Sequence, residues 1–349
     1  MTSPVVRSKL LTIGLMLILL AGCTRRQGST SSPEGNRYAT GFRIEQRDTC
    51  TLVEVFSPQT TYIITQPIRR MATASCTHIG FIDALGQLPS VVAVCNKDLV
   101  YTLLPDSVLD AGDSMSPNVE VVMRAGVDGV MVSTYAQGDR ASEQFLKMGL
   151  QVIYNNEWQE SSPLARAEWI RFVGAFYGCL PLADSIFGEV EQRYLALAEH
   201  NSAAQGDKAA PKILSGNNFR GTWYVPSGNT YMGNLFRDAG ADYPYYDDLR
   251  QGSIPLTIEK VLSEFSDADV WVGSNGHSLD ELSRMDEKHT WFRAYQTGRV
   301  YNWYKQTTPT GGNNFWERGV VHPEEILQDL IAILSFAPDS TLVFAEHLQ

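Results

Sequence analysis

The feature that most constrains the fold is a long run of helical spacing near the middle of the chain, at residues 181–201. Apolar side chains recur there at every third or fourth position over about five turns, which predicts one long helix. They are Leu182, Ile186, Val190, Tyr194 and Leu197. The segments on either side carry a different pattern. We therefore expect two folded halves joined by this helix.

Short apolar strands alternate with helical patterns in both flanking segments. A hairpin at 51–56 and 61–65 comes first. The first half then shows strands at 70–74, 91–94, 129–132 and 151–154, with helices at 77–85, 119–125 and 141–148. The second half shows strands at 212–215, 270–273 and 300–301, with helices at 231–239, 258–265, 279–285 and 323–336. This alternation predicts a parallel sheet covered by helices in each half.

The two halves also share a local pattern around one glutamate each. Glu120 is followed eight positions later by Asp128, just before a strand, and Glu259 is followed eight positions later by Asp267 in the same setting. Each glutamate stands in the first turn of an expected amphipathic helix, where the helix dipole favours a carboxylate. Taken alone, the pattern is explained by helix starts. Its repetition indicates two related halves.

The amino terminus has the order of a secretory signal. Arg7 and Lys9 precede an apolar run at 10–20, which is too short to span a bilayer permanently, and Ala21, Gly22 and Cys23 follow. This predicts a signal peptide at 1–22 and a lipid on Cys23, because the segment resembles the bacterial lipobox. Residues 23–40 are polar and are expected to form a flexible tether. We expect a product facing the periplasm, anchored to the cell membrane or to the outer membrane.

Charge and composition narrow the partners. The formal net charge is −11, and removal of residues 1–22 takes away only Arg7 and Lys9, which gives −13. An acidic chain argues against nucleic acid, whose phosphates require clustered basic residues. The remaining length exceeds what one core fills, so we expect lobes at 41–180 and 205–349 around a linking helix at 181–204. Pairing of the cysteines stays open: Cys50, Cys76, Cys95 and Cys179.

These features together resemble one family, the substrate-binding lipoproteins of ABC importers for metal chelates such as cobalamin, ferric siderophores and haem. The resemblance covers roughly residues 71–333, and its local matches lie at 116–120, 255–262 and 224–228. It implies an α/β fold of two Rossmann-like lobes with central parallel sheets, joined by one long backbone helix, with the ligand cleft between the lobes. It also implies that Glu120 and Glu259 dock against the two permease subunits and that ligand binding changes the hinge only slightly.

The cleft should be lined by loops at the carboxyl ends of the strands, where open α/β sheets bind ligands. Many of the side chains in these loops are aromatic, which suits a flat corrin or porphyrin, whereas an anionic siderophore usually requires basic residues such as Arg220 and Lys305. We expect the segment at 311–316 to add a further, mobile wall. The candidates are Ser75, Cys76, Thr77, His78, Tyr135 and Trp158 in the first half, and Trp223, Tyr224, Asn275, His277, Trp303, Tyr304 and Trp316 in the second.

The sequence favours a binding protein over an enzyme. The six histidines are scattered, without the HxxxH or HxH spacing of a metal site, and no GxSxG motif is present. We therefore expect no catalytic residue, no resident metal and no cofactor, with the metal belonging to the ligand. The expected partners are the chelate, a permease dimer with its ATPase, and a membrane; the receptor itself is expected to be monomeric. A chelatase-like enzyme and a surface scavenger without an importer stay open as alternatives.

Overall fold

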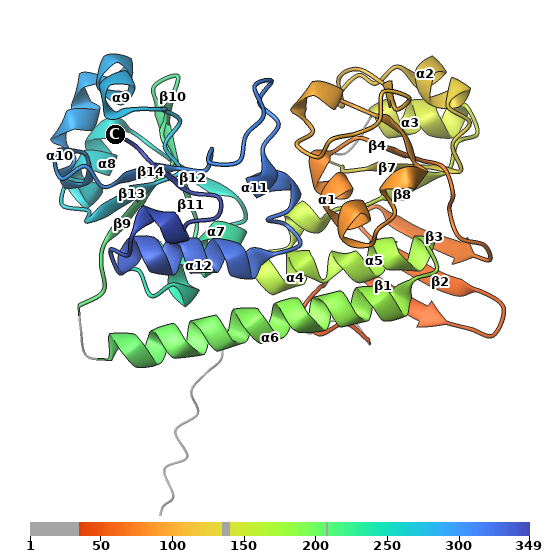
Figure 1. Ribbon diagram of the computed structural model, residues 1–349, viewed down its shortest axis with the longest axis horizontal. Helices are drawn as coiled ribbons and strands as arrows, with labels where there is room; N and C mark the ends of the chain where they lie inside the picture. Colours follow the sequence, from red (N-terminus) through yellow and green to blue (C-terminus); the bar gives the residue numbers. More distant parts are fainter. Residues whose placement is uncertain (1–34, 135–139, 207–208) are drawn as a thin grey trace, which may run out of the picture. The chain divides into compact units, whose positions relative to one another are not determined.

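The computed structural model describes residues 35–134, 140–206 and 209–349, which belong to one compact unit. Strands and helices alternate along this part of the chain, as Figure 1 shows. Within the described ranges, no helix is both long enough and apolar enough to cross a membrane. The expected signal peptide, Cys23 and Tyr135 lie outside the described residues.

The N-terminal half, defined here as the described residues before 180, is built on a five-stranded sheet of order β6-β5-β4-β7-β8. All neighbouring strands are parallel. The order reverses between β4 and β7, and the carboxyl ends of two such strands form a natural ligand crevice. The strands are β4 Met71–Thr73, β5 Val91–Val94, β6 Leu109–Asp110, β7 Gly129–Val132 and β8 Val152–Tyr154, and the helices are α1 Cys76–Ala84, α2 Val119–Arg124 and α3 Arg140–Lys147.

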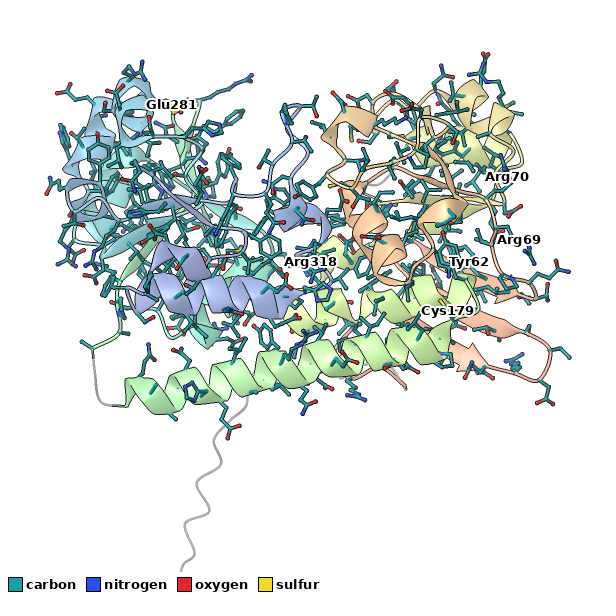
Figure 2. The ribbon with its side chains drawn as sticks, viewed as in Figure 1. Tyr62, Arg69, Arg70, Cys179, Glu281 and Arg318 are labelled. Atoms are coloured by element: carbon teal, nitrogen blue, oxygen red, sulfur yellow. The ribbon has the colours of Figure 1, made fainter. Side chains whose placement is uncertain are left out.

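An antiparallel meander precedes this sheet. It consists of β1 Phe42–Gln46, β2 Thr51–Phe56 and β3 Gln59–Ile64. The hydroxyl oxygen of Tyr62 on β3 accepts the backbone N–H of Tyr154 on β8 at 2.9 Å, which ties the meander to the parallel sheet (Figure 2). Phe42 packs its ring against Trp169 and Phe172 of α5 Trp169–Phe176, a helix that follows α4 Pro163–Ala167. The predicted hairpin is confirmed, and β1 extends it.

The predicted long helix is confirmed as α6, Leu180–Gln205, 26 residues without a break. At about 1.5 Å per residue it is about 39 Å long. It packs against α5 from the N-terminal half and against α12 Pro323–Leu334 from the C-terminal half. Its buried stripe differs by one position from part of the expected one, because Ala183 and Phe187 face inward and Leu182 is exposed. The helix packs against a different helix in each half, so its buried face does not follow a single regular repeat along its length.

The C-terminal half, the described residues after 205, repeats the parallel arrangement with an antiparallel edge. Its sheet has the order β15-β14-β13-β9, in which only the β14–β15 pair is antiparallel. A separate antiparallel ribbon, β10-β11-β12, was not predicted. The strands are β9 Ile213–Ser215, β10 Asn218–Phe219, β11 Thr222–Pro226, β12 Ser253–Leu256, β13 Val270–Val272, β14 Val300–Asn302 and β15 Glu346–His347. The helices are α7 Tyr231–Asp238, α8 Ile258–Phe265, α9 Leu279–Met285, α10 Arg293–Gln296, α11 Asn314–Glu317 and α12.

A second connection between the halves runs through the segment 308–317, which we call the strap. The carboxylate of Glu317 on α11 accepts the backbone N–H groups of Tyr101 and Thr102 at 2.8 and 2.9 Å. The hydroxyl of Thr310 donates to the carbonyl of Asp98 at 2.6 Å. A side chain at Gly80 on α1 would collide with the backbone of Glu317. The strap is therefore part of the C-terminal half in sequence, but it is hydrogen-bonded to the backbone of the N-terminal half.

The four described cysteines are free thiols, and none of them pairs with another. Burial raises the pKa of Cys76 to about 11 and that of Cys95 to about 12. Both thiols are therefore protonated near neutral pH, and a thiol is a much weaker nucleophile than a thiolate.

Candidate ligand-binding site

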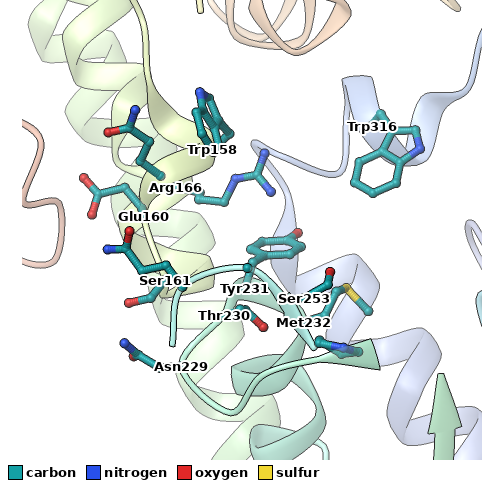
Figure 3. A pocket seen from close by; sticks show the side chains of 14 residues that line it. Trp158, Glu160, Ser161, Arg166, Asn229, Thr230, Tyr231, Met232, Ser253 and Trp316 are labelled. Carbon is teal, nitrogen blue, oxygen red and sulfur yellow. The ribbon is translucent and has the colours of Figure 1, made fainter. Parts of the chain in front are cut away.

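A cavity of about 410 Å³ is lined by residues from both halves of the chain (Figure 3). Its volume is within the range of small-molecule sites in proteins. The N-terminal half contributes the 3-10 turn Glu157–Gln159 and the helix α4. The C-terminal half contributes the end of β11, the start of α7, the turn before β12 and the end of α11. We call this space the cavity.

Among the described residues that line the cavity, Arg166 is the one with a positive charge. It projects from α4, whose amino terminus is capped by the hydroxyl oxygen of Ser162 accepting the N–H of Ala165. Its Nη2 pairs with Glu157 Oε1 at 3.2 Å, and its guanidinium lies 4.6 Å from the ring centroid of Tyr231. Among the described residues, its buried Nε has no hydrogen-bond partner. The guanidinium of Arg166 therefore places a positive charge in the cavity wall, which suits an anionic group of a ligand.

Two tryptophans give the cavity exposed aromatic surface. Trp158 is 40% exposed and Trp316 is 48% exposed, and both line the cavity, as Figure 3 shows. Trp316 is supported by Phe315, whose ring it meets edge-on at 4.7 Å, and Phe315 stacks on Trp303 at 4.7 Å. Large aromatic faces left open in a cavity favour a flat or apolar ligand surface.

The start of α7 is shaped by glycines at close approaches. The backbone of Gly228 lies so near the carbonyls of Tyr245 and Tyr246 that a side chain would collide, and Gly233 is equally close to the carbonyl of Ser227. Thr230 caps the helix by accepting the N–H of Gly233 at 3.2 Å. This tight turn brings Tyr231 beneath Arg166, and burial raises the pKa of the Tyr231 phenol well above its usual value. The phenol is neutral and acts as a platform for the guanidinium.

Two of the residues expected to bind ligand, Trp158 and Trp316, line the cavity. The group that follows β4 lies elsewhere: Ser75 caps α1 and accepts the N–H of Thr77 at 3.3 Å, and Cys76 and Thr77 are half-buried. His78 is fully buried, with Nε2 3.1 Å from the hydroxyl of Ser133. Burial lowers the pKa of His78 to about 3, so the ring is neutral. In this structure His78 contacts Ser133, the residue that follows β7, and does not line the cavity.

The other expected residues of the C-terminal half stand outside the cavity lining. Trp223 is buried against Trp271 and donates its indole N–H to the carbonyl of Ser215 at 2.9 Å. Trp303 is buried beneath the strap, where it stacks on Phe315. Tyr224 is exposed on strand β11. The rest are exposed or half-buried on loops: Asn275, His277 and Tyr304, of which His277 and Tyr304 lie with ring centroids 5.1 Å apart.

Several lining residues were missed by the sequence analysis: Arg166, Tyr231, Met232 and Ser253. Arg166 gave a usable signal, because it is the one charged residue of α4, whose other four residues are apolar. A lone charge in a buried helix needs a partner or a ligand. Arg220 and Lys305, the basic residues considered for a siderophore, lie outside the lining; Lys305 donates to the carbonyl of Leu342.

Glu120 and Glu259 each stand in the first turn of a helix, α2 and α8 respectively, with their side chains reaching solvent. Asn118 caps α2 and Thr257 caps α8, so the repeated pattern has the same local cause in both halves. Hydrogen bonding to its own backbone N–H and to Thr257 lowers the pKa of Glu259, and Lys288 lies 3.7 Å away. Both carboxylates are accessible to a partner, and their docking role stays a prediction.

A sequence match over most of the chain shows its family. Residues 72–307 match the model of a family described as periplasmic binding protein. The chain belongs to the periplasmic binding protein family. An uncharacterized lipoprotein of Methanocaldococcus jannaschii is 25% identical over 288 residues, which cover 78% of this chain and 66% of that protein. The match thus spans slightly less than two thirds of the relative.

Solved structures agree on the fold. A periplasmic heme binding protein from Pseudomonas aeruginosa superimposes with a TM-score of 0.63 at 18% identity, over 81% of this chain and 98% of that one. The periplasmic vitamin B12 binding protein BtuF of Vibrio cholerae gives a TM-score of 0.56 at 12% identity, over 77% and 98% of the two chains. The predicted resemblance and the two-lobed α/β fold class with a long linking helix are confirmed.

Proposed function

We propose that this chain is the extracytoplasmic substrate-binding component of an ABC importer for a metal chelate, and that it delivers its cargo chemically unchanged. Membership of the periplasmic binding protein family supports the binding role. The cavity supports a small-molecule cargo, because its volume and mixed lining are those of a ligand site.

The observation that carries the choice of cargo is the positive charge of Arg166, in a cavity that Trp158 and Trp316 also line. A cation and two partly exposed tryptophans favour a ligand with an apolar face and an acidic group. Haem has both, as a flat macrocycle that carries carboxylates. We therefore place haem-like chelates first, ahead of cobalamin, whose side chains are amides, and ahead of ferric siderophores.

The proposed setting is the outer face of a membrane. Cys23 would carry the lipid, and Glu120 and Glu259 would meet basic residues of the two permease subunits. Exposed charge pairs add little affinity but steer orientation, which suits a receptor that docks and leaves. The lipoprotein name of the relative from Methanocaldococcus jannaschii supports the anchor.

The experiment is a visible absorption titration of the purified protein with haem, cobalamin and a ferric hydroxamate in separate series. We expect a shifted haem band that comigrates with the protein in size-exclusion chromatography. If only cobalamin or only the hydroxamate binds, that chelate and not haem is the proposed cargo, and the proposed receptor role still holds. If none of the three chelates binds, the proposed function is wrong.

A second measurement separates delivery from catalysis. The bound chelate is extracted after prolonged incubation and analysed by mass spectrometry, with a protein-free sample as the control. We expect the same mass and the same metal content as before binding. A new product, or loss of the metal only when the protein is present, would favour the chelatase-like alternative.

The anchor is tested by replacing Cys23 with serine in the full-length chain. Metabolic labelling with a radioactive fatty acid should mark the unmodified sequence and not the Cys23→Ser variant, and the variant should appear in the soluble fraction. A Cys76→Ser variant is the matched control, because that thiol is half-buried within the fold. Equal labelling of all three proteins would rule out Cys23 as the lipid site.

A further inference from the structure

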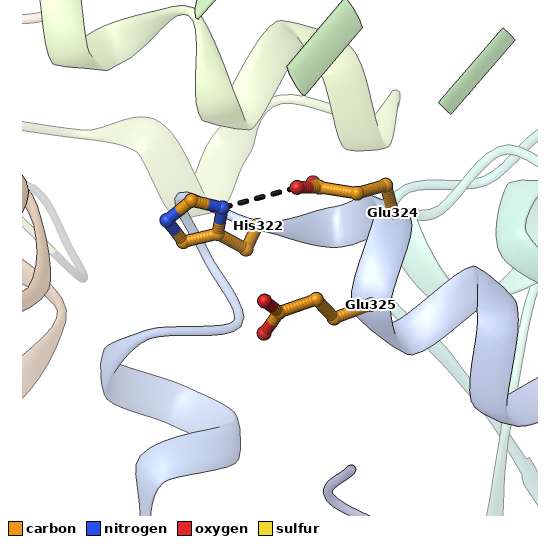
Figure 4. A group of neighbouring side chains, drawn as sticks. All are labelled: His322, Glu324 and Glu325. Carbon is orange, nitrogen blue, oxygen red and sulfur yellow. Dashed lines mark hydrogen bonds and ion pairs between the residues drawn. The ribbon is translucent and has the colours of Figure 1, made fainter. Parts of the chain in front are cut away.

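Three potential metal ligands gather at the amino terminus of α12, and none of them belongs to the cavity lining. They are His322, Glu324 and Glu325, and one ligand atom from each lies within 4.8 Å of the others (Figure 4). His322 Nδ1 is 3.1 Å from Glu324 Oε1. In a tetrahedral zinc site, with bonds of about 2.0 to 2.2 Å, neighbouring ligand atoms are about 3.3 to 3.6 Å apart. The first pair, at 3.1 Å, is hydrogen-bonded and would need to separate only slightly to share a metal ion.

A second observation concerns Glu324 itself, whose side chain is only 4% exposed. Its Oε1 is 3.1 Å from His322 Nδ1 and 3.4 Å from Arg193 Nη2. Its Oε2 is buried and has no hydrogen-bond partner among the described residues. A buried oxygen of an ionised carboxylate is costly to leave unpaired. The cluster thus contains an acceptor that the protein itself does not satisfy.

The third ligand is held by a cation. Arg318 binds both oxygens of Glu325, at 2.6 and 2.9 Å. A metal ion would have to take one of these oxygens from Arg318, so metal and guanidinium compete for Glu325. An adjoining cavity of about 190 Å³, lined in part by His322 and Arg318, has room for the water that would complete the coordination shell.

We propose that His322, Glu324 and Glu325 form a structural site for a divalent transition metal of the zinc class. One imidazole nitrogen and two carboxylate oxygens are a ligand set that zinc accepts, with water in the fourth position. The metal replaces the proton between His322 and Glu324, and Glu324 turns its unpaired oxygen toward the ion. None of the three residues lines the 410 Å³ cavity, so this metal is separate from the cargo.

The position of the site gives the metal a structural role. Glu324 also contacts Arg193 on α6, and His322 lies between the strap and α12. A bound ion would therefore hold His322 against the first turn of α12. Any ligand that binds only the folded state raises its stability, so metal binding should be visible as a higher melting temperature.

The test is isothermal titration of the full-length, metal-free protein with zinc chloride, with magnesium chloride as the reference ion. We expect one zinc ion per chain and no comparable binding of magnesium. His322→Ala and Glu324→Gln should each weaken zinc binding by about tenfold or more, because each removes a ligand. Arg318→Ala should tighten it by about threefold, because it frees Glu325. His200→Ala, at an exposed position on α6, is the matched control and should bind as the unmodified protein does.

A spectroscopic readout keeps the result independent of stability. Cobalt chloride added to the unmodified protein should give the intense visible bands of four-coordinate cobalt, and His322→Ala should not. Cargo affinity, measured by absorption titration, should be the same in both proteins, so failure here is distinguishable from failure of the receptor role. Zinc binding that persists unchanged in His322→Ala, or its absence from the unmodified protein, would overturn the site.

Discussion

The two walls of the cavity differ in chemistry. Both charged residues of the lining, Glu160 and Arg166, come from the N-terminal half, whereas every lining residue from the C-terminal half is neutral. The charged wall is anchored internally: Arg166 pairs with Glu157, and Glu160 accepts the indole N–H of Trp169 at 3.0 Å. The neutral wall offers Tyr231, Met232 and Trp316. The wall from the N-terminal half is therefore suited to bind a charged group of a ligand, and the wall from the C-terminal half is suited to contact its uncharged surface.

The largest effect should come from Arg166. Arg166→Ala should weaken binding of a carboxylate-bearing macrocycle by about 50-fold, because a charge-assisted hydrogen bond of about 2.3 kcal/mol is lost. A macrocycle whose acids are esterified should bind the two proteins alike. Arg220→Ala, at an exposed position outside the lining, is the control and should leave affinity unchanged. If the ester and the acid lose affinity equally in Arg166→Ala, charge reading by this wall is wrong.

A somewhat smaller effect is expected on folding stability at low pH, through His78, which is connected by hydrogen bonds to the charged wall. His78 holds Ser133, and Ser133 donates to the carbonyl of Asn155, just before the turn that bears Trp158. Burial lowers the pKa of His78 to about 3 in the folded protein, from an ordinary value of 6.5. The unfolded chain thus binds a proton first, so this stabilisation is complete above pH 6.5 and is lost as the pH falls toward 3. The loss should reach about 2 kcal/mol at about pH 5.

Chemical denaturation at about pH 7.5 and about pH 5 measures this loss. His78→Gln retains a polar group toward Ser133 but cannot take up a proton, so it should lose about 2 kcal/mol less than the unmodified protein between the two pH values. His200→Gln on the exposed side of α6 should behave as the unmodified protein does. An identical pH dependence of stability in all three proteins would mean that protonation of His78 does not cause the loss of stability at low pH.

The neutral wall is tested by its tryptophan. Trp316→Ala should weaken macrocycle binding by about tenfold, because an open aromatic face contributes about 1.4 kcal/mol. The loss should be equal for the acid and the ester, unlike that of Arg166→Ala. Trp291→Ala, at an exposed tryptophan outside the lining, is the control. A loss confined to the acid form would break the division between the two walls.

The smallest effect on cargo affinity should come from the two glutamates at the helix starts. Glu120→Arg and Glu259→Arg should leave the absorption titration unchanged, because both side chains lie outside the lining. Uptake of the chelate by cells should nevertheless fall strongly in the double variant, since reversed charges repel basic permease residues. Unimpaired uptake would contradict docking through these residues and would favour the scavenger alternative.

Much of the fold could be predicted because it depends on local spacing. The alternation of strands and helices around 181–201 identified both parallel sheets and α6. The antiparallel ribbon β10-β11-β12 was missed, since its strands are short and two of them are separated by the whole of α7. For the same reason β6 and β15, of two residues each, gave no readable pattern.

The candidate site was less predictable. Trp158 and Trp316 were predicted as candidates because they are aromatic residues in or beside loops, and both line the cavity. Arg166 was missed because its role depends on Tyr231, a residue of the other half, and on a turn that only the close approach of Gly228 creates. Loop position also suggested Trp223 and Trp303, which the fold buries. Sequence spacing identifies which residues share an element, whereas contacts between distant elements decide which of them reach a cavity.

The strap has a consequence for the kinetics of cargo exchange. Because Glu317 and Thr310 bind the backbone of the other half directly, any separation of the halves must first break these hydrogen bonds. Under the proposed receptor role, cargo would therefore enter a cavity that is already formed. The association rate of the cargo should then be limited by diffusional encounter and not by closing of the two halves. The residence time of the cargo should depend on its contacts inside the cavity alone.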